Sequence, residues 1–466
     1  MPRRHVVAAI VACAGLSLIA LAPAATSAPK SLAFSKPVGL SSFAPARTVV
    51  GDEYSVQDTQ SPATHEWAGE PSIQVDRSGT IYIAGVCCVV AASPVWASHD
   101  GGKTFAEMET PGHIREWGVG AEGELATDDK GTVVFTDTFI PSMLTTVWSD
   151  HGKTWQRTSP SSGVVPGMND RPWLAWTPQA LYLYVNYSAY VQTYSSTDMG
   201  LTWNAGQPVP WRGNINAQQF FPGHIAADKR TGRLWIAGVV CDEATEEDTV
   251  NGCPLQQRLI GSGVSTDGGQ TWSNAPVSKP QRGFISPIFT GASAVDARGT
   301  AYTTWSTYNK TGCDVYYAAS TNGGKSWHKP VKVNTGKGCA TFPWVAAGAG
   351  GKISVVWYQT SFHDELKNVG AGAAYQDAIP KKELWHAYAA AIVGADSKSP
   401  AIVRGEIPSG PVLTGPMNRE LWDFFENAIG PDGRVYVAFV KKYKDGKPDN
   451  APQTWFTHTT TGPRLR

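Results

Sequence analysis

The sequence predicts an all-β fold, a single β-propeller of seven four-stranded blades, with six blades as the alternative. Three observations lead to this prediction. An apolar hairpin pattern recurs at a step of about 59 residues, which suits a four-stranded blade with its loops. A short turn motif recurs five times between these hairpins. The 48 Gly and 32 Pro among 466 residues supply the turns that many short strands need.

The first element expected is an export signal at residues 1–28. A basic start precedes an apolar run at 6–21, and small residues then lead to a cleavage site after Ala28 or Ala24. A run of about 16 apolar residues is too short to span a membrane, and no later run is long enough. We therefore expect a secreted, extracellular and monomeric protein with no membrane insertion after signal cleavage. The expected parts of the mature chain are an N-terminal linker at 29–45 and the propeller domain at 46–466.

The hairpins come next along the chain, and each consists of an apolar strand, a polar turn and a second apolar strand. They occupy residues 71–86, 123–138, 171–187, 224–240, 292–306, 342–359 and 426–440. A third strand and the turn motif follow each of the first five, while 384–400 and 453–463 are weaker equivalents in the last two. Residues 46–50 are expected to complete the last blade.

The turn motif has the form S-x-D-x-G-x-T-W. Its copies are SHDGGKTF from Ser98, WSDHGKTW from Trp148, STDMGLTW from Ser196, STDGGQTW from Ser265 and STNGGKSW from Ser320. An Asp or Asn side chain accepts backbone N–H bonds across a tight turn, and Gly supplies the permissive backbone. This is the Asp-box, or BNR repeat, and the chain resembles the Asp-box β-propellers of the sialidase (neuraminidase) superfamily. The resemblance implies structural box residues between the third and fourth strands: Asp100, Asp150, Asp198, Asp267 and Asn322.

Six cysteines remain after the signal, an even number that favours disulfides in an exported protein. Cys241 and Cys253 bracket an acidic loop and are the first expected pair, which leaves Cys313 with Cys339. Cys87 and Cys88 are adjacent, so they either close a strained ring or remain buried thiols. No spacing of Cys or His indicates a zinc site, so no metal ligands are predicted.

Candidate functional residues follow from aligning the hairpins on their turns, which places several carboxylates at the mouth of the central channel. The alignment gives Glu70, Glu122 and Glu426 as candidate catalytic residues, and the neighbouring segment 418–427 adds Asp423. Neighbouring carboxylates suit hydrolysis of a glycosidic bond, because one can stay protonated beside the other. Further in, the channel lining is expected to include Ser72, Glu124, Trp173, His224 and Trp344, of which the two Trp and His224 are candidate sugar contacts. The alternative is that these glutamates bind water or backbone N–H groups, or hold a structural Ca²⁺.

Sialidases grip the carboxylate of their substrate with three arginines, and the resemblance implies such a set here. The candidate substrate-binding arginines are Arg171, Arg115, Arg212, Arg282 and Arg419. The F/Y-R-I-P signature of the first sialidase arginine is absent, and RPW at Arg171 is the nearest sequence.

Composition limits the class of partner. The chain has 39 Lys+Arg and 39 Asp+Glu, so it lacks the basic excess typical of nucleic-acid binding. Two hypotheses remain: a sialidase-like exo-glycosidase that needs no cofactor, or a non-catalytic propeller that binds carbohydrate or protein. The expected partner is a glycan or glycoconjugate. Fold alone does not separate the two.

Overall fold

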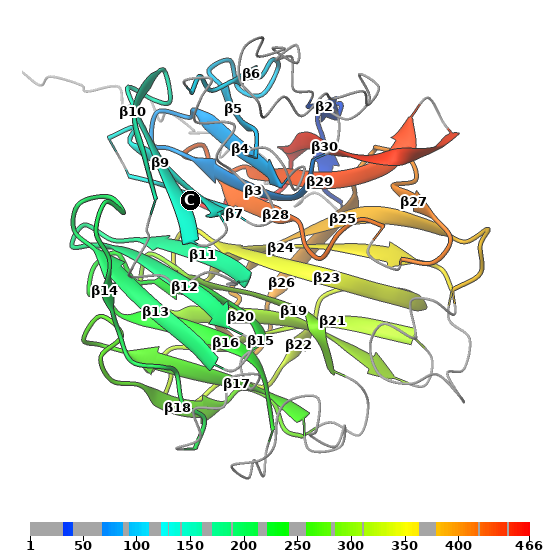
Figure 1. Ribbon diagram of the computed structural model, residues 1–466. Coiled ribbons are helices and arrows are strands. Elements are labelled where there is room, and N and C mark those ends of the chain that lie inside the picture. Colours follow the sequence, from blue (N-terminus) through cyan, green and yellow to red (C-terminus); the bar gives the residue numbers. More distant parts are fainter. Residues whose placement is uncertain are drawn as a thin grey trace, which may run out of the picture.

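The computed structural model shows an all-β protein, a β-propeller (Figure 1). It describes residues 31–40, 68–86, 93–110, 123–128, 130–139, 142–160, 170–187, 190–212, 221–241, 258–280, 285–309, 312–362, 379–417, 420–444 and 447–466. Within these ranges, no helix has the length and apolar character needed to cross a membrane.

Four sheets have four strands each, with neighbouring strands antiparallel and in chain order. The first contains β3 (Gly69–Val75), β4 (Ile81–Val86), β5 (Val95–Ser98) and β6 (Ala106–Glu107). The second contains β7 (Gly123–Thr127), β8 (Val133–Phe139), β9 (Ser142–Ser149) and β10 (Thr154–Pro160). The third contains β11 (Asp170–Trp176), β12 (Leu181–Tyr187), β13 (Tyr190–Ser196) and β14 (Asn204–Ala205). The fourth contains β15 (Phe221–Ala227), β16 (Leu234–Cys241), β17 (Arg258–Ser265) and β18 (Ser273–Pro276).

A fifth sheet joins the two ends of the described chain. It contains β28 (Glu426–Ile429), β29 (Val435–Lys444), β30 (Lys447–Thr461), β1 (Ala33–Phe34) and β2 (Val38–Gly39). Its main path is β1-β30-β29-β28, and β2 also pairs with β30, beside which it lies in Figure 1. These short strands lie in the predicted linker, while residues 46–50 fall outside the described ranges.

The remaining strands form one nine-stranded sheet. It contains β19 (Ile285–Val295), β20 (Ala301–Asn309), β21 (Gly312–Ser320), β22 (Val331–Lys332), β23 (Gly338–Ala347), β24 (Lys352–Thr360), β25 (Leu384–Val393), β26 (Ala401–Glu406) and β27 (Leu413–Thr414). The predicted count of seven separate four-stranded blades is therefore wrong, and so is the alternative of six. Five sheets follow a four-strand path and the sixth has nine strands.

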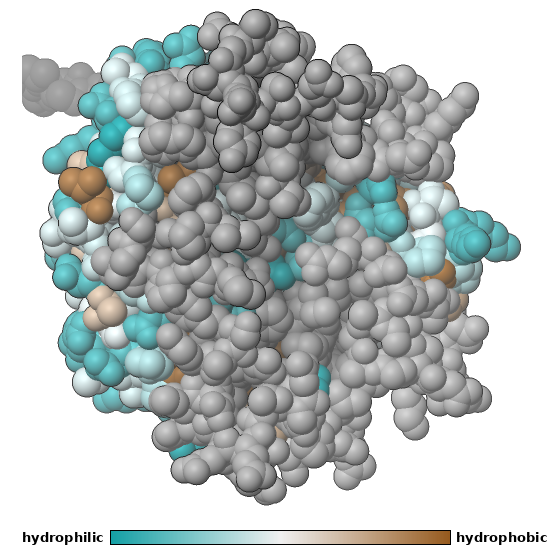
Figure 2. Space-filling view, viewed as in Figure 1, coloured by the Kyte–Doolittle hydropathy of each residue, from teal (hydrophilic) through white to brown (hydrophobic). Residues whose placement is uncertain are grey.

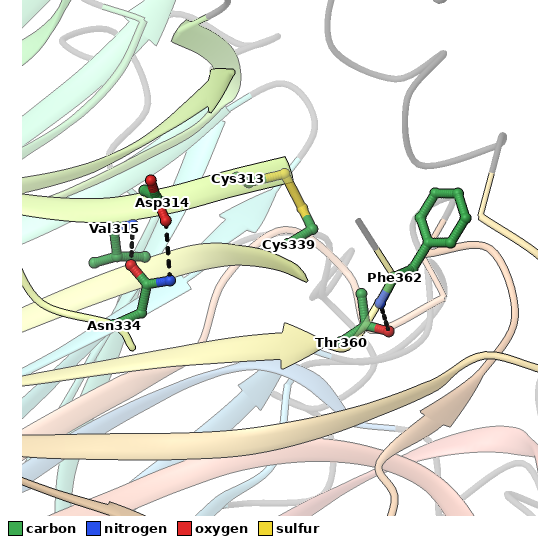
Figure 3. Close-up of a disulfide and its surroundings, with 7 residues drawn as sticks. All are labelled: Cys313, Asp314, Val315, Asn334, Cys339, Thr360 and Phe362. Atoms are coloured by element: carbon green, nitrogen blue, oxygen red, sulfur yellow. Dashed lines mark hydrogen bonds between the residues drawn. A yellow bond between two sulfur atoms is a disulfide. The ribbon is translucent and has the colours of Figure 1, made fainter. Parts of the chain in front are cut away.

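The physical reason is a parallel pairing of β21 with β23, through Gly312 with Gly338 and Cys313 with Cys339. The same two cysteines form a disulfide, with Cα atoms 4.1 Å apart (Figure 3). Asn334 adds a nearby bridge, since its Oδ1 accepts from the Val315 N–H at 2.9 Å. Cys241 is also disulfide-bonded, and its predicted partner Cys253 lies outside the described residues, as do Cys87 and Cys88.

Each Asp-box turn connects the third strand of a hairpin unit to a fourth strand, which is short in every unit except the second, where β10 follows. In the fourth box, Asp267 Oδ1 accepts from the backbone N–H groups of Gln270 and Thr271, at 3.1 and 2.9 Å. Its Oδ2 accepts from the Thr271 hydroxyl at 2.6 Å. Asp100, Asp198 and Asn322 make comparable bonds. The second box differs: Trp148 replaces the first Ser, and Asp150 takes a left-handed φ of 51°.

Centrally, the first strand of each hairpin contacts the first strand of the next, and β28 contacts β3, which closes the ring. The face seen in Figure 2 is mainly hydrophilic where the described residues show, with small scattered apolar spots. Among the described residues, the exposed large hydrophobic side chains are Met199, Leu201 and Leu384. Because the first strands contact one another at the centre of the ring, side chains from several sheets meet there.

Candidate functional site

The first strands enter the centre of the ring through bulges. The pairing register shifts between Gly69 and Ser72, between Asp170 and Trp173, and between Thr341 and Trp344. The residues inside these shifts, Glu70, Arg171 and Phe342, have positive φ angles of 40°, 57° and 51°. Such angles are uncommon for residues with a Cβ, and bulges redirect side chains. Three equivalent positions thus share a strained backbone.

A buried ion pair joins Arg171, at one of these bulges, to Asp423. Arg171 Nη2 donates to Asp423 Oδ2 at 2.6 Å, and the two side chains are 4% and 0% exposed. Glu70 Oε1 accepts from the Asp423 backbone N–H at 3.1 Å. Trp422, at a φ of 60°, sits against Gly69, where an added Cβ would come within 2.3 Å of its ring. The segment 420–426, which we call the strap, therefore ties the first and third sheets together.

Two further carboxyl groups lie deeper. Glu426 Oε2 accepts from the Ile73 N–H at 3.0 Å. Glu124 Oε2 accepts from the Leu174 N–H, and Glu124 Oε1 lies 2.9 Å from His224 Nε2. Each carboxylate thus reaches the first strand of the following sheet, which strengthens the ring.

The local charge favours a proton on Glu426. Burial raises its pKa well above the ordinary value of 4.5, and the nearby charge of Glu124 raises it further. Glu426 Oε1 is buried without a hydrogen-bond partner among the described residues, as is the indole nitrogen of Trp173. A neutral carboxyl therefore lies near another carboxyl group, which is the arrangement that acid–base catalysis uses.

Aromatic side chains surround these groups. The ring centroid of Trp173 lies 4.7 Å from that of Phe424 and 5.4 Å from those of His224 and Trp344. The Arg171 guanidinium carbon is 5.9 Å from the centroid of the Phe424 ring. We call these side chains, together with Arg171 and the nearby carboxyl groups, the central cluster. Its members are Glu70, Glu124, Arg171, Trp173, His224, Trp344, Asp423, Phe424 and Glu426. The cluster is closely packed, because Trp173 is only 3% and Trp344 only 6% exposed.

The structure brings together most of the residues predicted from the sequence. Those in the central cluster are Glu70, Glu426, Asp423, Arg171, Trp173, Trp344 and His224. Arg212 is exposed, and its guanidinium carbon lies 5.7 Å from the Trp211 ring centroid. Glu122, Arg115, Arg282 and Arg419 lie outside the described residues.

Two members of the central cluster were missed as functional candidates. Glu124 was placed in the channel lining but not among the catalytic residues, although its position two residues inside Glu122 was the available signal. Phe424 is the other, and no sequence pattern distinguishes it from its neighbour Phe425. Among the described residues, no group of three or more His, Cys, Asp or Glu side chains is arranged to hold a metal ion.

Comparison with known proteins adds a short match and a set of distant structures. Residues 264–274 match the family model "BNR/Asp-box repeat", which covers the fourth turn motif. No curated protein matches the sequence.

Similar solved structures include carbohydrate-active enzymes. An α-L-arabinofuranosidase from Fusarium graminearum is 13% identical, with 62% of this chain and 88% of that chain covered and a TM-score of 0.41. An α-L-arabinanase from Penicillium chrysogenum is 11% identical, with coverage of 84% and 92% and a TM-score of 0.39. The polysaccharide lyase Uly1 is 11% identical, with coverage of 84% and 90% and a TM-score of 0.45. At these identities and scores, the function has to follow from the chain's own residues.

Proposed function

We propose that the protein is an exported, sialidase-like exo-glycosidase that hydrolyses a terminal sugar at the central cluster. The observation that carries this proposal is the buried Glu426 beside Glu124, since the charge of Glu124 helps to keep Glu426 protonated. Aromatic rings packed around His224, the partner of Glu124, suit the apolar faces of a sugar. The proposal includes secretion through the signal at 1–28, a monomeric state and no required cofactor.

Glu426 and Glu124 each have a role in this reaction. Glu426 donates its proton to the glycosidic oxygen as the bond to the sugar carbon breaks. Glu124 accepts a proton from the water that attacks that carbon, so the sugar gains a hydroxyl and the aglycone leaves as an alcohol. Arg171 is held by Asp423 and serves to position the strap. A narrower form of the proposal is that the terminal sugar is sialic acid. Binding the carboxylate of that sugar would need further arginines beside Arg171.

One observation favours a second candidate, a non-catalytic propeller that binds carbohydrate or protein. Glu70, Glu124 and Glu426 each accept a backbone N–H bond from another segment of the ring. These bonds give all three side chains a structural role that needs no substrate.

Hydrolysis of a panel of fluorogenic glycosides, sialosides included, separates the two. The assay uses purified mature protein with and without calcium, and the variants Glu426→Gln and Glu124→Gln. Glu420→Gln is the matched control, since Glu420 lies on the same strap as Glu426 but its side chain is 43% exposed and paired with Lys442. Turnover by the wild type and the control, but loss in both cluster variants with the fold retained, supports the enzyme. No turnover of any glycoside leaves the binding protein as the better account.

A further inference from the structure

A second candidate site lies on the outer strands of the nine-stranded sheet, away from the central cluster. A cleft of about 450 Å³ opens where β24 ends and β25 begins, and Glu406 at the end of β26 also lines it. This volume is in the range of small-ligand sites. No residue of the central cluster lines it, because the cluster is built mainly on the innermost strands and the strap.

One wall of the cleft contains Tyr388 and Glu406 from neighbouring strands, and the buried Trp357 supports Tyr388. Trp357 pairs with Tyr388, and Tyr388 pairs with Glu406, so their side chains share one face of the sheet. The rings of Trp357 and Tyr388 stack, with centroids 5.7 Å apart and planes inclined by 12°. Glu406 lies 2.7 Å from His386 Nδ1 and accepts from the Tyr388 hydroxyl at 3.2 Å. These contacts fix the positions of an aromatic ring and a carboxylate.

The opposite charges in the cleft are not equivalent. The Glu383 carboxylate accepts from the Thr360 hydroxyl at 2.8 Å and from the Ser361 hydroxyl at 2.5 Å. By contrast, Lys337 and Lys382 are exposed, and neither has an ion-pair partner among the described residues. Each fixed carboxylate keeps lone pairs for further donors. The cleft therefore offers two unpaired cations together with oriented hydrogen-bond acceptors.

We propose that this cleft is a second, binding-only site for a saccharide that carries a carboxylate, such as a uronic acid. The two lysines face the sugar's carboxylate, whereas Glu383 and Glu406 accept from its hydroxyl groups. Tyr388 and Leu384, which is 39% exposed, contact the apolar face of the ring. A simple anion would gain from the lysines but meet two carboxylates, and a neutral sugar would leave the lysines unused. A hydroxylated acid uses both sets of groups.

Ligand-observed NMR titration tests this inference with a matched pair of probes. Methyl β-glucuronide and methyl β-glucoside share one ring and differ in the carboxylate, and acetate supplies the carboxylate alone. The full mature chain is titrated with each probe, as are the variants Lys337→Met, Lys382→Met and their double variant. Lys398→Met is the control, because Lys398 is exposed at the other end of β25 and outside the cleft.

We expect the glucuronide to bind several-fold more tightly than the glucoside. Each cleft lysine removed should weaken glucuronide binding by up to about fivefold, which is the range for a solvent-exposed ion pair. Lys398→Met should change nothing. Equal binding of the two glycosides, competition by acetate as strong as by glucuronide, unchanged binding in the double lysine variant, or no binding at all would each overturn the proposal.

The central cluster does not enter this result. Glu426→Gln should bind glucuronide like the wild type, while Lys382→Met should leave any glycoside turnover unchanged. Loss of glucuronide binding in Glu426→Gln would mean that the NMR signal reports the central cluster, and the cleft assignment would then be wrong. Failure of the proposed hydrolysis would leave the binding measurement intact.

Discussion

Arg171 and Asp423 are ionised side chains that the fold takes out of water together. Replacing Arg171 by Met leaves the Asp423 carboxylate buried without its cation, so we expect the free energy of unfolding to fall by about 3–5 kcal/mol. The double variant Arg171→Met with Asp423→Leu removes both charges and should recover much of that loss. Urea titration measures both. A cost below about 1 kcal/mol for Arg171→Met would instead resemble an exposed ion pair and would contradict the burial.

Glu426 should make stability depend on pH in a defined direction. Its folded pKa is raised by burial and by Glu124, so the folded state holds the proton more tightly than the unfolded chain does. The contribution is complete below the ordinary pKa of 4.5 and is lost as the pH rises toward the raised value. Glu426→Gln, which cannot ionise, should therefore gain stability relative to wild type between about pH 5 and pH 8. Urea titration of wild type and Glu426→Gln at about pH 5 and about pH 8 measures the free energy of unfolding of each. An equal change in the two proteins would show that Glu426 does not titrate in this range.

The sequence could place these side chains but not their partners. Aligning the hairpins placed Glu70 at the channel mouth, and the structure gives Glu70, Arg171 and Phe342 the same left-handed backbone. The pairing of Arg171 with Asp423 joins residues 252 positions apart. It depends on the path of the strap across the ring, which no local pattern reports. The sequence therefore predicted an available arginine where the structure has one already paired.

At the scale of elements, the Asp-box turns should weaken in acid. The Thr271 hydroxyl and then its backbone N–H lower the pKa of Asp267 to about 2. This stabilisation is present above the ordinary value of 3.8 and is lost as the pH falls toward 2. Asp267→Asn should cost at most about 1 kcal/mol at neutral pH, because the carboxylate is exposed to water, and should flatten the acid limb of stability. Asn322 already occupies this place in the fifth box, so removing the turn's response to acid should leave its shape intact.

The disulfide between β21 and β23 should stabilise the folded protein. Their disulfide closes a loop with a sequence separation of 26 residues, and replacing Cys313 and Cys339 by Ala should cost about 3.5 kcal/mol. The backbone approach beside it requires Gly312, where an added Cβ would lie 2.1 Å from the Gly338 carbonyl oxygen. Thermal unfolding with and without reductant measures the effect. A reduced wild type as stable as the oxidised one would show that strand pairing alone holds β21 to β23.

The hairpin repeat predicts the propeller fold but not the number of separate sheets. Hairpin recurrence is local in sequence, so it indicated the all-β propeller and the places of the turns. The join between β21 and β23 is a parallel pairing of two strands with β22 between them in the chain, and the hairpin pattern carries no sign of it. Contacts between segments distant in sequence are also what the linker interpretation of 29–45 omitted, since β1 and β2 pair with β30 more than 400 residues later.

We expect those two short strands, which pair with β30, to stabilise the closed ring. Leu32 and Leu40 flank them and are 5% and 2% exposed, and the Leu40 N–H donates to the Thr454 carbonyl at 2.9 Å. Leu40→Ala should lower the free energy of unfolding by about 2–5 kcal/mol, because it leaves a cavity beside β30. Lys36→Ala is the control, since Lys36 is exposed between the same strands.

Deleting residues 31–40 should cost more than Leu40→Ala and also expose the edge of β30. An unpaired edge strand recruits other strands, so the deletion variant should associate in size-exclusion chromatography while Leu40→Ala stays like wild type. Urea titration gives the stability of each variant. If the deletion variant unfolded like the wild type and eluted at the same volume, contact of β28 with β3 would be sufficient to close the ring, and the N-terminal strands would serve only to cover β30.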